Sequence, residues 1–241
     1  MLRTIILLII GFVLLIKGAD FLVNGASAIA RKFHIPEMII GLTIVAFGTS
    51  LPELVVNIQA AFAGSTDIAI SNVLGSNISN ILLIIGITSI IVPLPIHRNT
   101  RTVDIPFMTL ILIVFSLLVA SPFAGEMTGV LDRSGALILL LVFGIFIYYL
   151  FFDAVVEEAD IETHSYTMWK SLLFIVLGLV GLTFGGDMIV DSAQKLAISR
   201  GMSERLIGLT VVALGTSLPE LATSVTAVLK GKTDLAIGNV V

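Results

Sequence analysis

The sequence predicts an all-α, polytopic membrane protein built from two inverted-topology repeats. Of its 241 residues, 57% are hydrophobic and only 12% are charged, which is too little charge for the surface of a soluble protein of this length. Long apolar runs alternate with short polar loops, and one stretch of the chain recurs in its second half. The runs are long enough to cross a bilayer as helices.

About eight hydrophobic segments are predicted. They lie at about residues 2–30, 35–63, 68–92, 103–121, 131–152, 169–197 and 203–229, and from 235 onward. The first segment is longer than the hydrocarbon core is thick, so we expect it to tilt. It is not a signal peptide, because the small residues Ala26-Ser27-Ala28 lie well beyond its apolar run and its second half recurs later in the chain.

An ungapped repeat organises these segments. Gly18–Leu74 aligns with Gly185–Val241, and about half of the aligned pairs are identical. The polar pairs are Asp20/Asp187, Glu53/Glu220, Asp67/Asp234 and Asn72/Asn239. Segments one to three match segments six to eight, and the odd number of crossings between counterparts inverts one repeat relative to the other. We therefore predict a first repeat at 1–152 with helices 1–5, an acidic linker at 153–168, and a second repeat at 169–241 with helices 6–8.

The motif "GTSLPEL" occurs at residues 48–54 and again at 215–221. Pro52 has no N–H to pair with the carbonyl of Gly48, so the helix is expected to break there, and the same holds for Pro219. An unpaired carbonyl in lipid costs several kcal/mol. Each break must therefore face protein, water or a ligand that binds oxygen, such as a cation.

Oxygen-bearing residues gather at both breaks. One copy contributes Ala46, Thr49, Ser50 and Glu53, and the other contributes Ala213, Thr216, Ser217 and Glu220. On the next segment, "NVLGSNISN" places Asn72, Ser76 and Asn80 at successive helical turns. Carboxylate, amide, hydroxyl and carbonyl oxygens suit hard cations such as Ca²⁺ and Na⁺, whereas zinc and copper favour imidazole and thiolate ligands.

Structural alternatives exist for several of these residues. A Gly-Pro kink with small polar neighbours is a common packing feature of membrane helices, although a duplicated buried glutamate favours function. Asn72 and Asn77 could simply form hydrogen bonds between helices. Asp20 and Asp187 could cap or pair, with Lys17 as the helical ion-pair partner of Asp20.

At these residues the sequence resembles the cation/calcium antiporter superfamily, and within it the prokaryotic sodium/calcium exchangers. Their paired alpha-repeat is matched by "GTSLPE" and "GSN", and the resemblance covers nearly the whole chain. It implies a ten-helix fold in two inverted halves, of which about eight helices are present. The chain ends at "DLAIGNVV", inside helix 8, where the first repeat continues with "GSNISN", so we expect a truncated protein.

The resemblance also implies roles for individual residues at a midplane ion site. By it, Glu53 and Glu220 bind Ca²⁺ directly, and Asn80 lies at the edge of the central site. Sodium-site oxygens come from Thr49, Ser50, Ser76, Thr216 and Ser217, and from the carbonyls of Ala46 and Ala213. The long first and sixth helices are expected to slide across the rest of the protein.

The predicted function is exchange of Na⁺ for Ca²⁺ across the cell membrane by alternating access. Proton or potassium coupling and a passive cation channel are the alternatives, and an intramembrane protease with Asp20 and Asp187 as its dyad is a weaker one, because no further catalytic motif is present. We expect no cofactor besides the transported calcium and sodium ions, no nucleic-acid partner and no requirement for an oligomer. The loops on the Arg31 side carry more Lys and Arg than the others, which predicts that this side and the linker 153–168 are cytoplasmic.

Overall fold

The structure is a computed structural model that describes residues 2–120, 131–152, 166–202 and 213–241. Within these ranges the chain forms helices joined by turns, and no strand occurs among them. Five of the described helices are long and apolar enough to span a membrane, and a sixth span is formed if a bent helix pair is counted as one. The all-α, polytopic prediction is confirmed.

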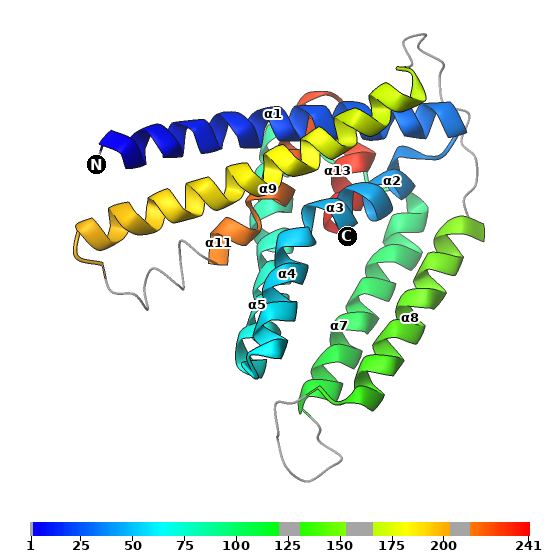
Figure 1. The fold of residues 1–241 in the computed structure, drawn as a ribbon. Coiled ribbons are helices and arrows are strands. Elements are labelled where there is room, and N and C mark those ends of the chain that lie inside the picture. Colours follow the sequence, from blue (N-terminus) through cyan, green and yellow to red (C-terminus); the bar gives the residue numbers. More distant parts are fainter. Residues whose placement is uncertain (1, 121–130, 153–165, 203–212) are drawn as a thin grey trace.

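The elements up to residue 152 agree with the predicted segments to within a few residues. They are α1 (Leu2–Phe33), α2 (Glu37–Ile40), the π-helix η1 (Gly41–Val45), α3 (Ala46–Thr49), α4 (Leu51–Phe62), α5 (Thr66–Ile78), η2 (Ser79–Ile84), α6 (Ile85–Ile91), η3 (Thr100–Asp104), α7 (Ile105–Ala120) and α8 (Arg133–Phe152). The π-helical turns join neighbouring α-helices into longer helical segments (Figure 1).

The second copy of the repeat follows the same order. Its helices are α9 (Met168–Ser199), α11 (Ala213–Thr216), α12 (Leu218–Leu229) and α13 (Thr233–Val240). Most of the predicted acidic linker, at 153–165, and the first part of the seventh segment, at 203–212, lie outside the described residues.

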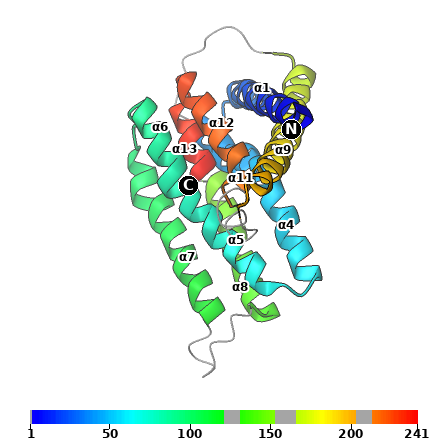
Figure 2. The same ribbon diagram turned by 90° about the vertical axis from the view of Figure 1, so that its left-hand side faces the viewer.

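The two copies run in opposite directions. The α4–α5 turn contains Gly64 and the α12–α13 turn contains its counterpart Gly231, with positive φ angles of 69° and 73° that glycine adopts without steric strain. Figure 2 shows these two turns at opposite ends of the molecule. This arrangement is the inversion that the repeat predicted.

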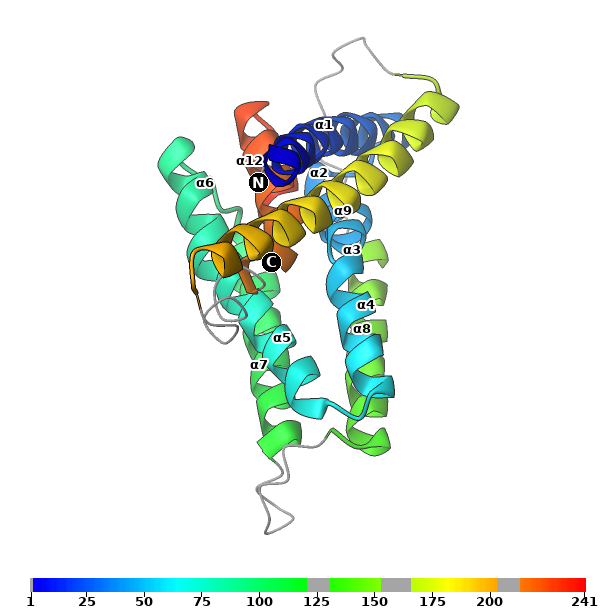
Figure 3. The same cartoon turned by 60° about the vertical axis from the view of Figure 1, so that its left-hand side comes forward.

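Helices α1 and α9 lie side by side and antiparallel (Figures 1 and 3). Their backbones approach closely at glycines, since a methyl group on Gly18 would lie 2.8 Å from the carbonyl oxygen of Gly178, and one on Gly185 would lie 2.8 Å from that of Gly11. Continuing the repeat alignment makes Gly11 the counterpart of Gly178 and Gly18 the counterpart of Gly185. The contact between Gly18 and Gly178 therefore recurs as the contact between Gly185 and Gly11, as expected around a two-fold axis.

The core lies where α1 and α9 meet α12 and α13. Leu22, Leu182 and Leu235 are almost completely buried there. By contrast, α7 and α8 expose large apolar side chains such as Leu110 and Leu141. These outer faces are suited to contact lipid rather than water.

Candidate functional site

Both copies of "GTSLPEL" interrupt a helix at the serine of the motif. α3 ends and α4 begins on either side of Ser50, and α11 and α12 are separated in the same way by Ser217. The two parts of the first broken helix meet at 48°. The predicted breaks are confirmed. They lie two residues before Pro52 and Pro219, because a proline is tolerated in the first turn of the helix that follows.

Each break places a buried carboxyl group in the first turn of the following helix. The exposed fraction is 7% for Glu53 and 2% for Glu220, and the two groups are close enough to repel each other when both are charged. Ser50 Oγ donates a hydrogen bond of 2.9 Å to Glu220 Oε1. Thr216 lies beside the carboxyl group of Glu53. Each carboxyl group thus faces a hydroxyl from the other repeat.

Asn239, near the end of α13, joins the two repeats within the site. Its Oδ1 accepts a hydrogen bond of 3.1 Å from Thr49 Oγ1. Its Nδ2 donates to the backbone carbonyl of Glu220 at 3.2 Å and to Ser224 Oγ at 2.9 Å. Asn239 is 4% exposed, so this network holds α13 against both motifs in a buried setting.

Asn239 and Ser224 were not among the predicted site residues, although the repeat contained a signal for them. Their counterparts Asn72 and Asn57 make the equivalent contact, with Asn72 Nδ2 donating to Asn57 Oδ1 at 2.9 Å. In each repeat a polar residue follows the glutamate by one turn, and an asparagine lies at the aligned position of the next helix. This pattern predicts the contact. Of the two asparagines for which a bond between helices was an alternative to a functional role, Asn72 makes such a bond. Asn77 donates to the carbonyl of Val73 on its own helix at 2.8 Å.

Several buried oxygens at the site have no hydrogen-bond partner within the described residues. They are both carboxyl oxygens of Glu53, Oε2 of Glu220, Oδ1 of Asn80, and the hydroxyls of Ser217 and Thr223. Leaving a buried polar atom unpaired costs about 1–3 kcal/mol. Carboxylate, amide and hydroxyl oxygens are the donor set that Ca²⁺ and Na⁺ prefer, so the set fits a hard cation.

The "GSNISN" segment approaches the site from the third crossing. η2, which carries Asn80, packs against α12 and α13, and α5, which carries Ser76, contacts α11. Ser76 Oγ donates to the carbonyl of Val73 at 3.1 Å. The lone pairs of that hydroxyl oxygen are not used by this bond, so its predicted role as a ligand stays a prediction.

Two alanine carbonyls, those of Ala46 and Ala213, are predicted ligands, and hydrogen bonds are described for that of Ala46. The carbonyl of Ala46 accepts the N–H of Ser50 at 3.1 Å and Thr49 Oγ1 at 3.2 Å. Ala213 is the first residue of α11, and its side chain lies outside the described part. Ion binding by either carbonyl also stays a prediction.

A cavity of about 400 Å³ adjoins the site between α4 and the broken helix of the second repeat on one side and α9 on the other. Asp187 and Asp191 line it from α9, Gln59 lines it from α4, and Thr216 and Pro219 line it from α11 and α12. Gln59 lies near the α4–α5 turn, so the cavity lining extends toward that end of α4.

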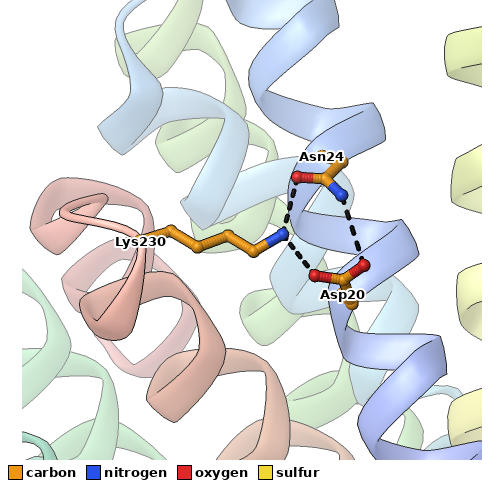
Figure 4. Close-up of polar contacts among 3 residues, drawn as sticks. All are labelled: Asp20, Asn24 and Lys230. Atoms are coloured by element: carbon orange, nitrogen blue, oxygen red, sulfur yellow. Dashed lines mark hydrogen bonds and ion pairs between the residues drawn. The ribbon is translucent and has the colours of Figure 1, made fainter.

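On the counterpart surface, a polar contact joins α12 to α1 (Figure 4). Lys230 Nζ lies 2.5 Å from Asp20 Oδ1 and 2.6 Å from Asn24 Oδ1. The expected pairing of Asp20 with Lys17 is wrong, because α12 packs against α1 and delivers Lys230 to Asp20 while Lys17 remains exposed. Position 63, the counterpart of Lys230, is an alanine that offers no such contact.

The sequence of the chain matches a known family model. Residues 3–152 and 170–241 match the model described as "Sodium/calcium exchanger protein". The chain belongs to this family. It is 41% identical over 246 residues to CaxA of Alkalimonas amylolytica, covering 100% of this chain and 76% of CaxA. It is 28% identical to the sodium/calcium exchanger MaX1 of Methanosarcina acetivorans, covering 98% and 77% of the two chains.

The fold is also that of a solved member of the exchanger family. Crystals of the sodium-calcium exchanger NCX_Mj soaked with Na⁺ and Sr²⁺ contain a chain that superposes with a TM-score of 0.84 at 30% identity, covering 99% of this chain and 77% of that one. The exchanger family consists of membrane transporters. The chain is therefore a multi-pass membrane protein of the cation/calcium antiporter type and not an enzyme.

Proposed function

We propose that the protein exchanges Na⁺ for Ca²⁺ at the site between the two "GTSLPEL" breaks. One observation carries the proposal: buried oxygens without partners gather around Glu53 and Glu220 and come from both repeats. Glu53, Glu220, Asn80, Ser76, Thr49, Ser50, Thr216 and Ser217, with the carbonyls of Ala46 and Ala213, are the proposed ligands. Thr223 is a further candidate.

Exchange follows from the charge of the site. Two carboxylates carry a charge of −2 when ionised, which one Ca²⁺ or two Na⁺ neutralise. Asn80 contributes a neutral amide, so it adds no charge that a further cation would have to balance. Because both ions use overlapping oxygens, they exclude each other. If the empty, charged site is too costly to move past the apolar barrier, only loaded states cross.

The two-fold arrangement supports alternating access. The cavity lined by Asp187 and Asp191 adjoins the site on one surface, while Lys230 ties α12 to α1 on the counterpart surface. The α1–α9 pair is packed backbone to backbone at its glycines. We propose that this pair moves as one unit and closes one surface as it opens the other, with Na⁺ driving Ca²⁺ transport.

We further propose that the protein lies in the cell membrane with the Arg31 end of α1 in the cytoplasm. The α4–α5 turn then lies on the outer side. The repeat boundaries at 1–152 and 169–241 and a cytoplasmic linker at 153–168 belong to the same proposal. No oligomer is needed, because both halves of the site come from one chain.

Calcium uptake into vesicles tests the function. The protein is reconstituted into vesicles loaded with Na⁺, and Ca²⁺ uptake is followed after dilution into Na⁺-free buffer. Uptake that requires internal Na⁺ supports the proposal. Uptake driven equally by K⁺ or by a proton gradient would indicate another coupling ion, and uptake that persists without any counter-gradient would indicate a channel.

A further inference from the structure

A second cavity, of about 250 Å³, lies away from the carboxylate site, where α1 ends and α12 turns into α13. Its polar and charged lining comes from three parts of the chain: Asn24, Ser27 and Arg31 of α1, Tyr166 before α9, and Lys230 and Lys232 of the α12–α13 turn. Two of these residues, Asn24 and Lys230, also make the contact between α1 and α12 described above.

The cavity has an excess of positive charge. Lys230 is paired with Asp20 at 2.5 Å, and Lys232 Nζ is paired with Glu37 Oε1 at 2.8 Å. Arg31 has no carboxylate partner in the described part of the chain. Among the described residues, three cations therefore face two carboxylates, and one positive charge has no carboxylate partner there.

Two buried polar atoms on the wall have no partner among the described residues. Ser27 is 3% exposed and its Oγ forms no hydrogen bond, and the same is true of the buried Nε of Arg31. A guanidinium can only donate, and a hydroxyl can donate or accept. A ligand that satisfies both atoms must therefore supply hydrogen-bond acceptors, and the uncompensated charge favours an anion.

The position of the cavity suits the headgroup layer of a membrane. Trp169, in the first turn of α9, is 80% exposed, and Lys170 Nζ lies 4.4 Å from the ring centre of Tyr166. Aromatic and basic side chains together are typical of the membrane–water boundary, and basic pockets between helices at that boundary bind anionic lipid headgroups.

We propose that this cavity binds a phosphate group, and that its source is the headgroup of an anionic phospholipid. Arg31 supplies a two-pronged contact to the phosphate oxygens. Ser27 donates from the wall, and Lys230 and Lys232 contribute charge from the α12–α13 turn. Inorganic phosphate has the same chemistry, and the test below separates the two sources.

The test is native mass spectrometry of the protein with phosphatidylglycerol, phosphatidylcholine or inorganic phosphate as the probe. Wild type is expected to retain phosphatidylglycerol in preference to phosphatidylcholine, and Arg31→Gln to weaken that binding about tenfold. Lys32→Gln is the matched control. It removes the same charge from the next residue, which is exposed and does not line the cavity, so it should change binding by less than about twofold.

Ser27→Ala provides a second variant that does not depend on charge. It removes an unpaired buried hydroxyl, so the lipid-free protein should unfold at the same or a higher temperature while phosphatidylglycerol binding falls. Arg31-dependent binding of either probe supports the site, and the probe that binds identifies the source. Equal losses in Arg31→Gln and Lys32→Gln, or unchanged binding in Ser27→Ala, would overturn the proposal.

Discussion

Replacing Gly18 with alanine tests the packing on which the two-fold arrangement rests. The added methyl group would lie 2.7 Å from the backbone nitrogen of Leu182, 2.8 Å from the carbonyl oxygen of Gly178 and 2.9 Å from the carbonyl carbon of Gly181. Favourable contacts need about 3.5–4.0 Å, so α1 and α9 must separate by roughly 0.7 Å or more. Backbone atoms cannot rotate out of the way as a side chain can.

The expected cost follows from that displacement. A radial gap of about 0.5–1 Å forfeits a quarter to a half of the dispersion attraction of the atoms involved, and overpacking of this kind typically costs about 1–3 kcal/mol. For a chain of this size each kcal/mol lowers the unfolding temperature by about 2–4 °C. Gly18→Ala should therefore lower it by about 2–12 °C.

Thermal unfolding in detergent measures the effect, with Gly144→Ala as the control. Gly144 lies in α8, and a methyl group there would have no atom within 4 Å. Since alanine is the better helix former by about 1 kcal/mol, the control should be neutral or slightly stabilised. If Gly18→Ala and Gly144→Ala unfold at the same temperature, the close approach of α1 and α9 is not as described.

Three further substitutions probe the site. Glu53→Gln should weaken the binding of Ca²⁺ more than that of Na⁺, because the lost attraction scales with the charge of the ion. Transport assays with and without competing sodium measure both, and equal losses for the two ions would contradict a carboxylate-centred site. Ser50→Ala removes the hydrogen-bond donor to Glu220 and one neutral oxygen. The ability of Na⁺ to compete with Ca²⁺ should therefore weaken about tenfold, with a smaller loss of Ca²⁺ binding. A larger loss for Ca²⁺ than for Na⁺ would refute the assignment of Ser50 to sodium. Lys230→Gln releases α12 from α1, so a single cysteine at Thr226, in a chain that has none of its own, should react faster with a water-soluble thiol reagent. An unchanged labelling rate would show that Lys230 does not hold α12 against α1.

Local chemistry let the sequence predict the helices and their breaks. Pro52 and Pro219 lack an N–H wherever they are placed, so the interruption before Glu53 and Glu220 does not depend on the neighbouring helices. The inverted topology was likewise predictable, because it requires only the repeat and an odd number of crossings. The resemblance of both motifs to the exchanger family added the expectation that Na⁺ and Ca²⁺ are the transported ions.

The partners across the repeats were decided only by the tertiary structure. The hydrogen bond from Ser50 to Glu220, and the position of Asn239 between Thr49 and Ser224, join residues that are far apart in the sequence. Such contacts depend on how the helices pack, and local periodicity carries no information about that.

The asymmetry of the protein is the clearest case of what the sequence leaves open. Two equivalent repeats permit the same contacts on either surface, and the alignment alone does not say how the two surfaces differ. In the structure α12 packs on α1, where Lys230 meets Asp20, while Asp187 on α9 faces a cavity. The sequence determined two similar half-sites, and packing decided which of them carries the contact between α12 and α1, because a pseudo-symmetric chain reaches the two arrangements with nearly the same local interactions.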